Sequence, residues 1–340
     1  MNSNFGNAYK AKLISTGSYL PETVIFNEDL KNFPGNSLQL IEVKTGIKSR
    51  RHAHKNETTS DLAIKAAKAC LEKIDFDPHE LDAIILSTSS PDRIQPATAT
   101  RVQYEIDASN AFAFDINSVC SGAVYGIYLA DALIKAQMCR NVLLIASEVY
   151  SKFLNPLDFA TYPYFGDGAG AALFCKDNAS SAGVIASLLK TDGSGADLVQ
   201  IPAGGTKLTF SDIINKRDVF FQMDGKAVYS FAIIRAPQVI DELLTVTGID
   251  KEKIKYVISH QANINIIQEI ASKTGIALDK FIINLDKYGN TASASILIGL
   301  DELFESGNIK EGDLILTVGF GGGLSWGANL LSLSKIKEKI

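Results

Sequence analysis

Cys120 is the side chain of this protein with the clearest potential for covalent chemistry. It lies in the run FDINSVCSGAV, residues 114–124, where a strand-like apolar segment gives way to a helix-like one. A thiol at the N-terminus of a helix meets free backbone N–H groups and the positive end of the helix dipole. These lower its pKa and favour a nucleophilic thiolate. The alternative is a buried, inert thiol, which position alone favours for an unpaired cysteine.

Two more polar residues lie at similar junctions. His260 follows the strand-like run 255–259 and precedes a helical run, and open α/β sheets place their sites at the carboxyl ends of strands. Asn290 lies in KYGNTASAS, residues 287–295, where a helix N-cap is its simplest role. The remaining histidines have charged, polar neighbours and are expected to be solvated: His52, His54 and His79.

The composition is that of an ordinary globular protein. Of the 340 residues 46% are hydrophobic and 21% charged, and the net charge of -5 does not suggest the basic patch that nucleic acids need. The four cysteines have no C-x-x-C spacing, so neither a zinc site nor a disulfide framework is indicated. No apolar run is long enough to span a membrane, and residues 1–17 lack the core of a secretion signal. We therefore expect a reducing, cytoplasmic location.

The elements that would position these residues alternate between strand-like and helical runs. In the first part, strands are expected at 82–88, 111–116 and 141–147, and helices at 59–73, 97–106 and 122–137. In the second part, strands are expected at 255–260, 281–284 and 313–319, and helices at 263–274 and 292–306. Such alternation predicts an α/β protein whose largely parallel sheets are covered by helices.

The chain also carries a repeated closing signature. FGDGAGAALF, residues 165–174, and FGGGLSWGANLL, residues 320–331, are each a glycine-rich turn followed by an apolar strand. We interpret this as an internal duplication. It predicts an N-terminal half, 1–180, that carries the nucleophile, and a C-terminal half, 181–340, that carries the histidine and asparagine. Residues 176–219 are interpreted as the connection between the halves with excursions over the surface.

Together the segments VCSGAVYG, FGDGAGAA, SHQAN, YGNTASAS and GFGGGLSWGA resemble the β-ketoacyl-acyl-carrier-protein synthase III family of condensing enzymes, which have the thiolase fold. The resemblance implies two βαβαβαββ halves in five layers (αβαβα) and a homodimer. It implies that Cys120 accepts a starter acyl group, and that His260 and Asn290 stabilise the enolate formed when a malonyl thioester loses CO₂. The backbone N–H groups of Cys120 and Gly322 would hold the tetrahedral oxyanion. No metal or other cofactor is implied.

The resemblance assigns ancillary roles as well. Packing around the site is expected from Phe320, Phe165, Phe221 and Gln95, the last of which would cap the acyl pocket of the partner subunit. Binding of the acyl-CoA or acyl-carrier-protein donor is expected from Lys44 and Lys273.

Several positions depart from the family pattern. Leu40 and Phe159 replace the pair that sandwiches the adenine of coenzyme A, and Asn265 replaces a docking cation. The polar Gln95 suggests a longer, wider or more polar acyl channel. We therefore expect decarboxylative condensation in fatty-acid initiation or, more in keeping with these departures, in specialised lipid or polyketide synthesis.

Three other functions stay open at this stage. The first is transfer of the acyl group from Cys120 to an oxygen or nitrogen nucleophile. The second is a non-catalytic partner subunit, which the presence of all three polar residues disfavours. The third is a papain-like protease, which uses Cys, His and Asn in this chain order. No CGSCW-type run surrounds Cys120, which disfavours the protease.

Overall fold

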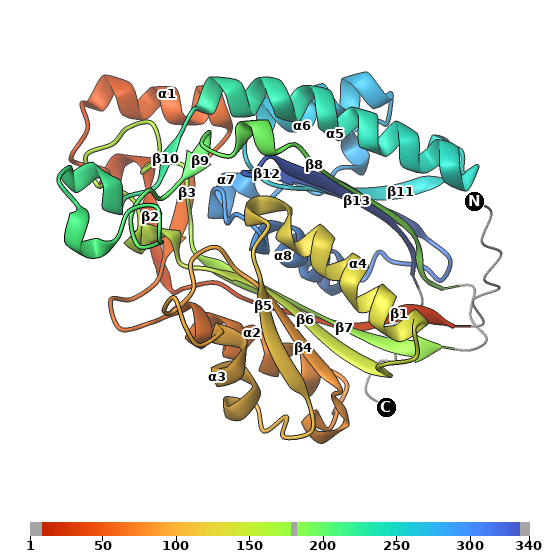
Figure 1. Cartoon of the computed structure of the whole chain (residues 1–340). Helices are drawn as coiled ribbons and strands as arrows, with labels where there is room; N and C mark the ends of the chain where they lie inside the picture. The colour runs from red at the N-terminus through yellow and green to blue at the C-terminus, as the bar shows by residue number, and fades with distance from the viewer. Residues whose placement is uncertain (1–8, 178–181, 334–340) are drawn as a thin grey trace.

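The computed structural model describes residues 9–177 and 182–333, and two β-sheets form its framework (Figure 1). The first sheet has the strand order β1-β7-β6-β4-β5. Strands β4, β5 and β6 are parallel to one another, and β7 and β1 complete the sheet in antiparallel pairing. Its strands are β1 (Lys10–Tyr19), β4 (Ala83–Ser87), β5 (Phe112–Ile116), β6 (Asn141–Glu148) and β7 (Gly168–Asp177).

The second sheet repeats this plan with one strand reduced. Its order is β11-β12-β13-β8, with β11 parallel to β12 and the other pairs antiparallel. Its strands are β8 (Gly183–Thr191), β11 (Ile254–Ser259), β12 (Leu314–Gly321) and β13 (Ser325–Ser332). A single parallel bridge between Val257 and Phe281 stands where the first sheet has β5.

The prediction of a strand at 281–284 is therefore wrong. The side chain of Gln261 supplies the physical reason. Its amide nitrogen donates to the carbonyl of Ile282 at 3.0 Å, and its oxygen accepts from the backbone N–H of Asn284 at 3.1 Å. These bonds replace a strand ladder, and the chain turns into the short helix α7 (Leu285–Tyr288) directly afterwards.

Helices make three layers around the two sheets (Figure 1). Helices α2 (Thr59–Glu72) and α3 (Thr98–Glu105) cover the first sheet, and α5 (Gly225–Thr247) and α6 (Ile264–Thr274) cover the second. Between the sheets lie α4 (Gly122–Lys135) and α8 (Ala294–Glu305), each of which contacts strands of both. The expected helices are confirmed to within two residues at most ends, whereas the 23-residue helix α5 was not anticipated.

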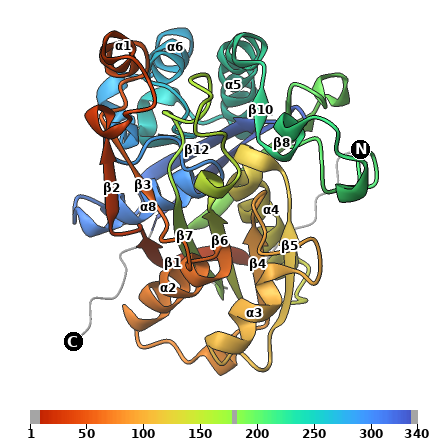
Figure 2. The same cartoon turned by 90° about the vertical axis from the view of Figure 1, so that its left-hand side faces the viewer.

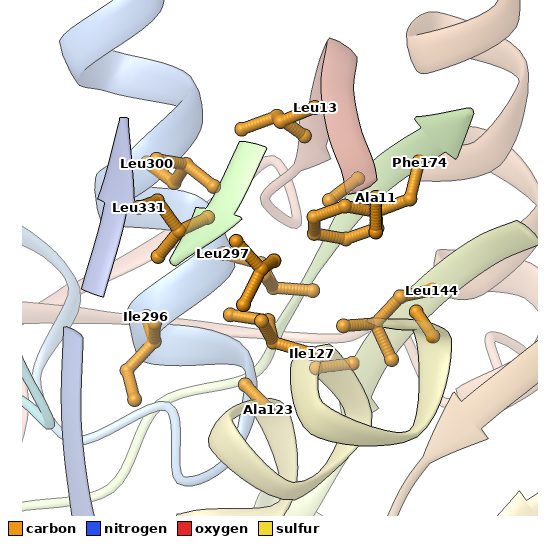
Figure 3. Packing of buried hydrophobic residues seen from close by; sticks show 14 of the residues in the cluster. Ala11, Leu13, Ala123, Ile127, Leu144, Phe174, Ile296, Leu297, Leu300 and Leu331 are labelled. Atoms are coloured by element: carbon orange, nitrogen blue, oxygen red, sulfur yellow. The ribbon is translucent and has the colours of Figure 1, made fainter. Parts of the chain in front are cut away.

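The central layer is almost wholly apolar. Ala123 and Ile127 of α4 meet Ile296 and Leu297 of α8, all at most 1% exposed, and Figure 3 shows the strand residues that close this cluster on both sides. Burial of this face anchors the two central helices. Their N-terminal ends are consequently held at defined positions between the sheets.

Smaller elements surround the same end of the molecule (Figure 2). They are α1 (Gly35–Thr45) and two antiparallel pairs, β2 (Thr23–Phe26) with β3 (Ser49–His52) and β9 (Val199–Gln200) with β10 (Gln222–Met223). The segment 176–219 is more than a connection, because it contains the sheet strand β8. The predicted boundary between residues 180 and 181 lies outside the described residues.

Candidate active site

Cys120 lies in a strained turn between β5 and α4. A single 3-10 turn, Val119–Ser121, precedes the first residue of the helix, Gly122. Val119 has φ +46°, which is unusual for a β-branched residue and marks a backbone held in place by its surroundings. A Cβ at Gly321, at the end of β12, would lie 2.9 Å from the Cβ of Cys120. Only glycine lets the two halves of the fold meet so closely around the thiol.

The expected lowering of the Cys120 pKa is wrong. The side chain is 9% exposed, and burial raises the pKa of the Cys120 thiol, with the Glu148 carboxylate raising it further and its own backbone N–H acting in the opposite direction. Because the 3-10 turn comes before the helix and a buried carboxylate lies near, the helix dipole does not decide the protonation state. At neutral pH Cys120 is a thiol and needs a base to become a nucleophile.

His260 can supply that base. It follows β11 directly, is 2% exposed, and its backbone N–H donates to Val318 at 2.8 Å. Burial lowers the pKa of His260 to about 3, while a hydrogen bond with the Ala292 carbonyl acts in the opposite direction. The ring is therefore neutral at neutral pH. It packs edge-on against Phe320 with centroids 5.3 Å apart, as the expected packing role of Phe320 requires.

A serine hydroxyl behind the ring controls which nitrogen carries the proton. Nδ1 of His260 lies 2.9 Å from Oγ of Ser295, and the same Oγ lies 2.8 Å from the carbonyl oxygen of Ala292. When Ser295 donates to Ala292, Nδ1 is the N–H donor and Nε2 is a base. When Ser295 donates to Nδ1, the proton of the neutral ring sits on Nε2, which then donates. This arrangement supports both neutral tautomers.

Asn290 is fixed by bonds on both its backbone and its side chain. Its N–H donates to Tyr164 at 2.8 Å, and its carbonyl accepts from Gly166 at 3.0 Å. Oδ1 accepts from the N–H of Ala292 at 2.9 Å, which leaves the Nδ2 group as a donor. The N-cap role is wrong, because α8 begins at Ala294 with Ser293 at its N-cap.

These three residues line one cavity of about 580 Å³. Its inner wall also includes Gly321 and Gly322, at the end of β12, and the buried rings of three phenylalanines. The phenylalanines are Phe165, Phe221 and Phe320. Exposed residues of α1, including Lys44, line its outer part together with Asn265. A deep pocket that is apolar inside and carries a few convergent polar groups is typical of a small-molecule site.

Two other expected site residues lie outside this cavity. Lys273 donates to the carbonyl of Ile233 at 2.8 Å and lies 3.6 Å from Glu269, so its charge is directed to its own surroundings. Gln95 is exposed and does not line the cavity of its own chain. Its role in a partner subunit stays a prediction.

The two positions matched to the adenine sandwich differ in their surroundings. Leu40 is 45% exposed. Phe159 is half-buried and packs edge-on against Phe33, with centroids 5.2 Å apart, and against Tyr164 at 6.2 Å. The ring of Phe159 is thus already engaged by aromatic neighbours of its own chain.

The expectation that His52 is solvated is wrong. His52 is 8% exposed, and burial lowers its pKa, with the neighbouring Asp167 carboxylate acting in the opposite direction. His54 and His79 are exposed as expected.

Glu148 is a residue near the site that the sequence analysis did not identify. It is fully buried at the end of β6 and accepts hydrogen bonds from Ser90 at 2.6 Å and from Ser293, in the loop of Asn290, at 2.7 Å. Burial raises its pKa, although these donors oppose the shift. A glutamate closing the apolar run NVLLIAS is the signal that could have found it, because a charge at the end of a buried strand needs partners.

Comparison with known proteins identifies the family of this chain. Residues 114–193 match the family model described as 3-oxoacyl-[acyl-carrier-protein] synthase III, and residues 244–333 match the model of its C-terminal part. A β-ketoacyl-[acyl-carrier-protein] synthase III of Caldanaerobacter subterraneus is 42% identical over 326 residues, which cover 96% of this chain and 98% of that protein. The chain belongs to the β-ketoacyl-acyl-carrier-protein synthase III family.

Solved structures agree with this membership. A synthase III from Aquifex aeolicus has a TM-score of 0.87 at 38% identity and covers 95% of this chain and 99% of its own. The priming β-ketosynthase of the R1128 polyketide pathway has a TM-score of 0.88 at 28% identity, covering 96% and 97%. These matches confirm the expected thiolase fold. They include a polyketide enzyme, so membership in the family leaves the pathway open.

Two further findings concern binding partners. Within the described ranges, no cluster of three or more His, Cys, Asp or Glu side chains is placed to hold a metal ion. In the same part of the chain, no helix has both the length and the apolar character needed to cross a membrane.

Proposed function

We propose that this synthase III family member joins a starter acyl group to a malonyl thioester by decarboxylative Claisen condensation. The observation that carries the proposal is the meeting of Cys120, His260 and Asn290 in one buried cavity. A neutral thiol, a neutral imidazole and an amide donor are the groups that this reaction needs. Acyl-CoA or acyl-carrier-protein thioesters are the substrates, and the chemistry requires no resident cofactor.

The first half-reaction loads the starter group. Nε2 of His260 takes the thiol proton as the sulfur of Cys120 attacks the thioester carbonyl. The tetrahedral oxyanion accepts hydrogen bonds from the backbone N–H groups of Cys120 and Gly322. When the intermediate collapses, the carbon–sulfur bond to the carrier breaks, and the departing thiolate takes the proton from His260. The products are acyl-Cys120 and the free carrier thiol.

The second half-reaction forms the carbon–carbon bond. The malonyl carboxylate leaves as CO₂, and its electron pair makes the thioester carbonyl an enolate. The Nδ2 group of Asn290 and the Nε2–H tautomer of His260 donate to the enolate oxygen. The carbanion then attacks the acyl carbon and expels the sulfur of Cys120, which takes up one proton. CO₂ leaves as a neutral molecule, so the negative charge of the carboxylate passes through the enolate to the sulfur of Cys120, where one proton from solvent neutralises it.

Two variants separate the half-reactions. Cys120→Ala abolishes acylation of the protein by an acyl thioester, measured by intact mass. Asn290→Ala still accepts the acyl group but releases no CO₂ from a malonyl thioester, because the enolate has lost a donor. Normal condensation by Asn290→Ala would contradict the role proposed for this residue. Acyl transfer to oxygen or nitrogen without CO₂ release would support the alternative transferase.

We also propose that two copies of the chain associate through β5, an edge strand of the first sheet. The ring of Phe112 is 49% exposed and stacks with Phe114, the centroids lying 6.2 Å apart. Exposed edge strands with apolar side chains readily pair with another strand. A second copy offers the same edge, and antiparallel pairing about a two-fold axis closes the assembly. This supports the expected homodimer.

We propose a reducing cytoplasm as the setting of the enzyme. The four cysteines are all free, and three of them are buried, which supports the proposed reducing cytoplasm. Lys44 is the cation proposed to meet the donor at the outer part of the cavity, and Lys273, which lies outside it, is the weaker candidate.

A further inference from the structure

We propose that Glu148 is a positioning residue for the condensation half-reaction, because its carboxylate binds Ser293 and so fixes the loop that aims the side chain of Asn290. The inference rests on the function proposed above and adds a residue that acts through others. Glu148 is fully buried, and no step of the proposed reaction uses it. Taking a carboxylate out of water is costly, so its partners indicate what it does.

The carboxylate is surrounded by hydrogen-bond donors. It accepts from the hydroxyls of Ser90 at 2.6 Å, Ser293 at 2.7 Å and Ser89 at 3.1 Å. The backbone N–H of Ser89 donates to it as well, at 3.2 Å. A backbone N–H can only donate, so these surroundings favour the charged form of the carboxyl group. Hydrogen bonds to a charged oxygen are also stronger than bonds between neutral groups.

These bonds join segments that lie far apart in the chain. Residues 89–90 follow β4 and Glu148 ends β6, whereas Ser293 precedes α8 and lies 145 positions after Glu148. A Cβ added at Gly122, the first residue of α4, would lie 3.5 Å from the Cβ of Ser293. The carboxylate therefore connects the first sheet to the loop of the catalytic asparagine, close to the turn that carries Cys120.

Ser293 matters because of its neighbour Ala292. The Oδ1 atom of Asn290 accepts from the backbone N–H of Ala292 at 2.9 Å. Ala292 has φ +46°, a conformation that alanine rarely adopts and that persists only where the surroundings enforce it. The bond between Ser293 and Glu148 is one residue away and supplies this constraint. The direction of the Asn290 amide thus depends on the buried carboxylate.

His260 is anchored elsewhere. Its backbone N–H donates to Val318 of β12 at 2.8 Å, and Ser295, the partner of its Nδ1 atom, lies inside α8. Loading of Cys120, which uses His260 as its base, should therefore survive a change at the carboxylate. Condensation needs the amide of Asn290 as well, and should not.

Two variants weaken the contact from opposite sides. Glu148→Gln removes the charge and turns an amide donor toward groups that already donate, and Ser293→Ala removes one hydroxyl. The Glu148 carboxylate raises the pKa of the Cys120 thiol, so loading of Glu148→Gln at pH 7 should be as fast as in the unmodified protein, or faster. Condensation should fall by about a hundredfold in Glu148→Gln and about tenfold in Ser293→Ala, as misplaced catalytic groups produce.

Each half-reaction is measured on the purified full chain. Acetyl, butyryl and octanoyl groups are offered on coenzyme A and on an acyl carrier protein, and the gain of mass at Cys120 gives the loading rate. Malonyl carrier protein is then added to the acylated protein. The loss of the acyl mass, with CO₂ release followed in parallel, gives the condensation rate.

Ser15→Ala is the matched control. Ser15 is as fully buried as Ser293, and its hydroxyl donates to the carbonyl of Cys70 at 2.6 Å. Both rates should stay those of the unmodified protein, and urea titration checks that the two serine variants lose similar stability. In the double variant Glu148→Gln/Ser293→Ala, the second change should alter condensation by less than about twofold, because the contact is already lost.

Several outcomes would overturn the proposal. Equal loss of loading and condensation in Glu148→Gln would show a general structural role. Condensation by Ser293→Ala at the rate of the unmodified protein, or additive effects in the double variant, would show that the two residues do not act as a pair. If Glu148→Gln does not fold, the comparison of Ser293→Ala with Ser15→Ala decides. An unmodified protein that loads no acyl group, or that releases no CO₂, overturns the proposed function itself and so distinguishes the two failures.

Discussion

Burial leaves both titratable groups of the site uncharged. It raises the pKa of the Cys120 thiol and lowers the pKa of His260 to about 3. A thiolate–imidazolium pair is therefore not the resting state, and the proton must move as the sulfur attacks. The Glu148 carboxylate, which also raises the thiol pKa, works in the same direction. Cys120 therefore stays a neutral thiol until a thioester with an electrophilic carbonyl carbon binds.

The buried His260 should make folding stability depend on pH. Its folded pKa of about 3 lies below the value of about 6.5 in an unfolded chain. Between these values the unfolded chain binds a proton that the folded protein excludes, so stability falls as pH falls below about 6.5. From pH 7 to pH 5 this group costs about 2 kcal/mol. His260→Gln should reduce the fall in the free energy of unfolding by that amount, measured by urea titration at both pH values.

The control for this prediction is His79→Gln. His79 is exposed and its pKa is raised by Asp77, so its loss cannot make the pH dependence shallower. His52 is buried and has a lowered pKa, so part of the fall should persist in the His260 variant. An unchanged pH dependence in His260→Gln would show that the ring is protonated in the folded protein.

Residue-level properties were harder to predict from sequence than residue identities. The three central residues were chosen correctly as a set that lies together, because their motifs are distinctive. The burial of His52 was missed because its neighbours in sequence are polar, whereas its charged neighbour Asp167 lies far along the chain. The thiol pKa was misjudged for the same reason, since Glu148 approaches Cys120 only in the folded structure.

At the scale of elements, the site is a meeting of strand ends and helix starts from both sheets. The end of β12 and the start of β13 both reach the turn before α4, where the hydroxyl of Ser325, the first residue of β13, lies 2.8 Å from that of Ser121. Gly319 and Gly321 lie at the end of β12 nearest the site. A Cβ atom added at either glycine would lie about 3 Å from an atom of the turn before α4. The nucleophile is thus positioned by a strand almost 200 residues away.

A methyl group at Gly321 tests this contact. In Gly321→Ala the new Cβ would lie 2.9 Å from both the Cβ and the backbone nitrogen of Cys120, so the turn must shift. The acylation rate should fall by about a hundredfold, the size of effect that a displacement of about 1 Å produces. Gly205→Ala is the control, because nothing lies within 4 Å of its would-be Cβ. Acylation by intact mass and the far-ultraviolet circular dichroism spectrum are measured for both variants.

Retention of full acylation by Gly321→Ala would show that the turn of Cys120 adapts freely. Loss of the folded spectrum in that variant alone would show that the contact matters for folding rather than for placement of the sulfur.

Elements with a strong pattern were predicted well. The strands at 82–88 and 141–147 are continuous apolar runs, and helices such as α2 show clear periodicity and begin at a capping residue, Thr58. The failures have tertiary causes. The strand at 281–284 is replaced by side-chain bonds from Gln261, and β8 was hidden in a segment rich in glycine and serine. Helix α5 carries an internal proline, Pro237, which weakens a helical prediction.

At the scale of the whole molecule, the edge strand β5 sets the proposed assembly. Phe112→Glu removes an exposed ring and places a charge on the edge strand of each copy, so the dimer should dissociate into monomers at micromolar concentration. Size-exclusion chromatography with light scattering measures the mass. Ile214→Glu is the control, because this side chain is 97% exposed and lies on a different segment. A monomeric unmodified protein would contradict the proposal directly.

The strand order of the two sheets has a consequence for synthesis on the ribosome. Tyr19 of β1 pairs with Ala169 of β7, which is synthesised 150 residues later. In the same way, β8 pairs with the much later strand β13. At about 5–20 residues per second, β1 emerges roughly 8 to 30 seconds before its partner strand. During that interval β1, with the sequence KAKLISTGSY, has no partner strand. The first sheet can therefore be completed only after β7 has left the ribosome.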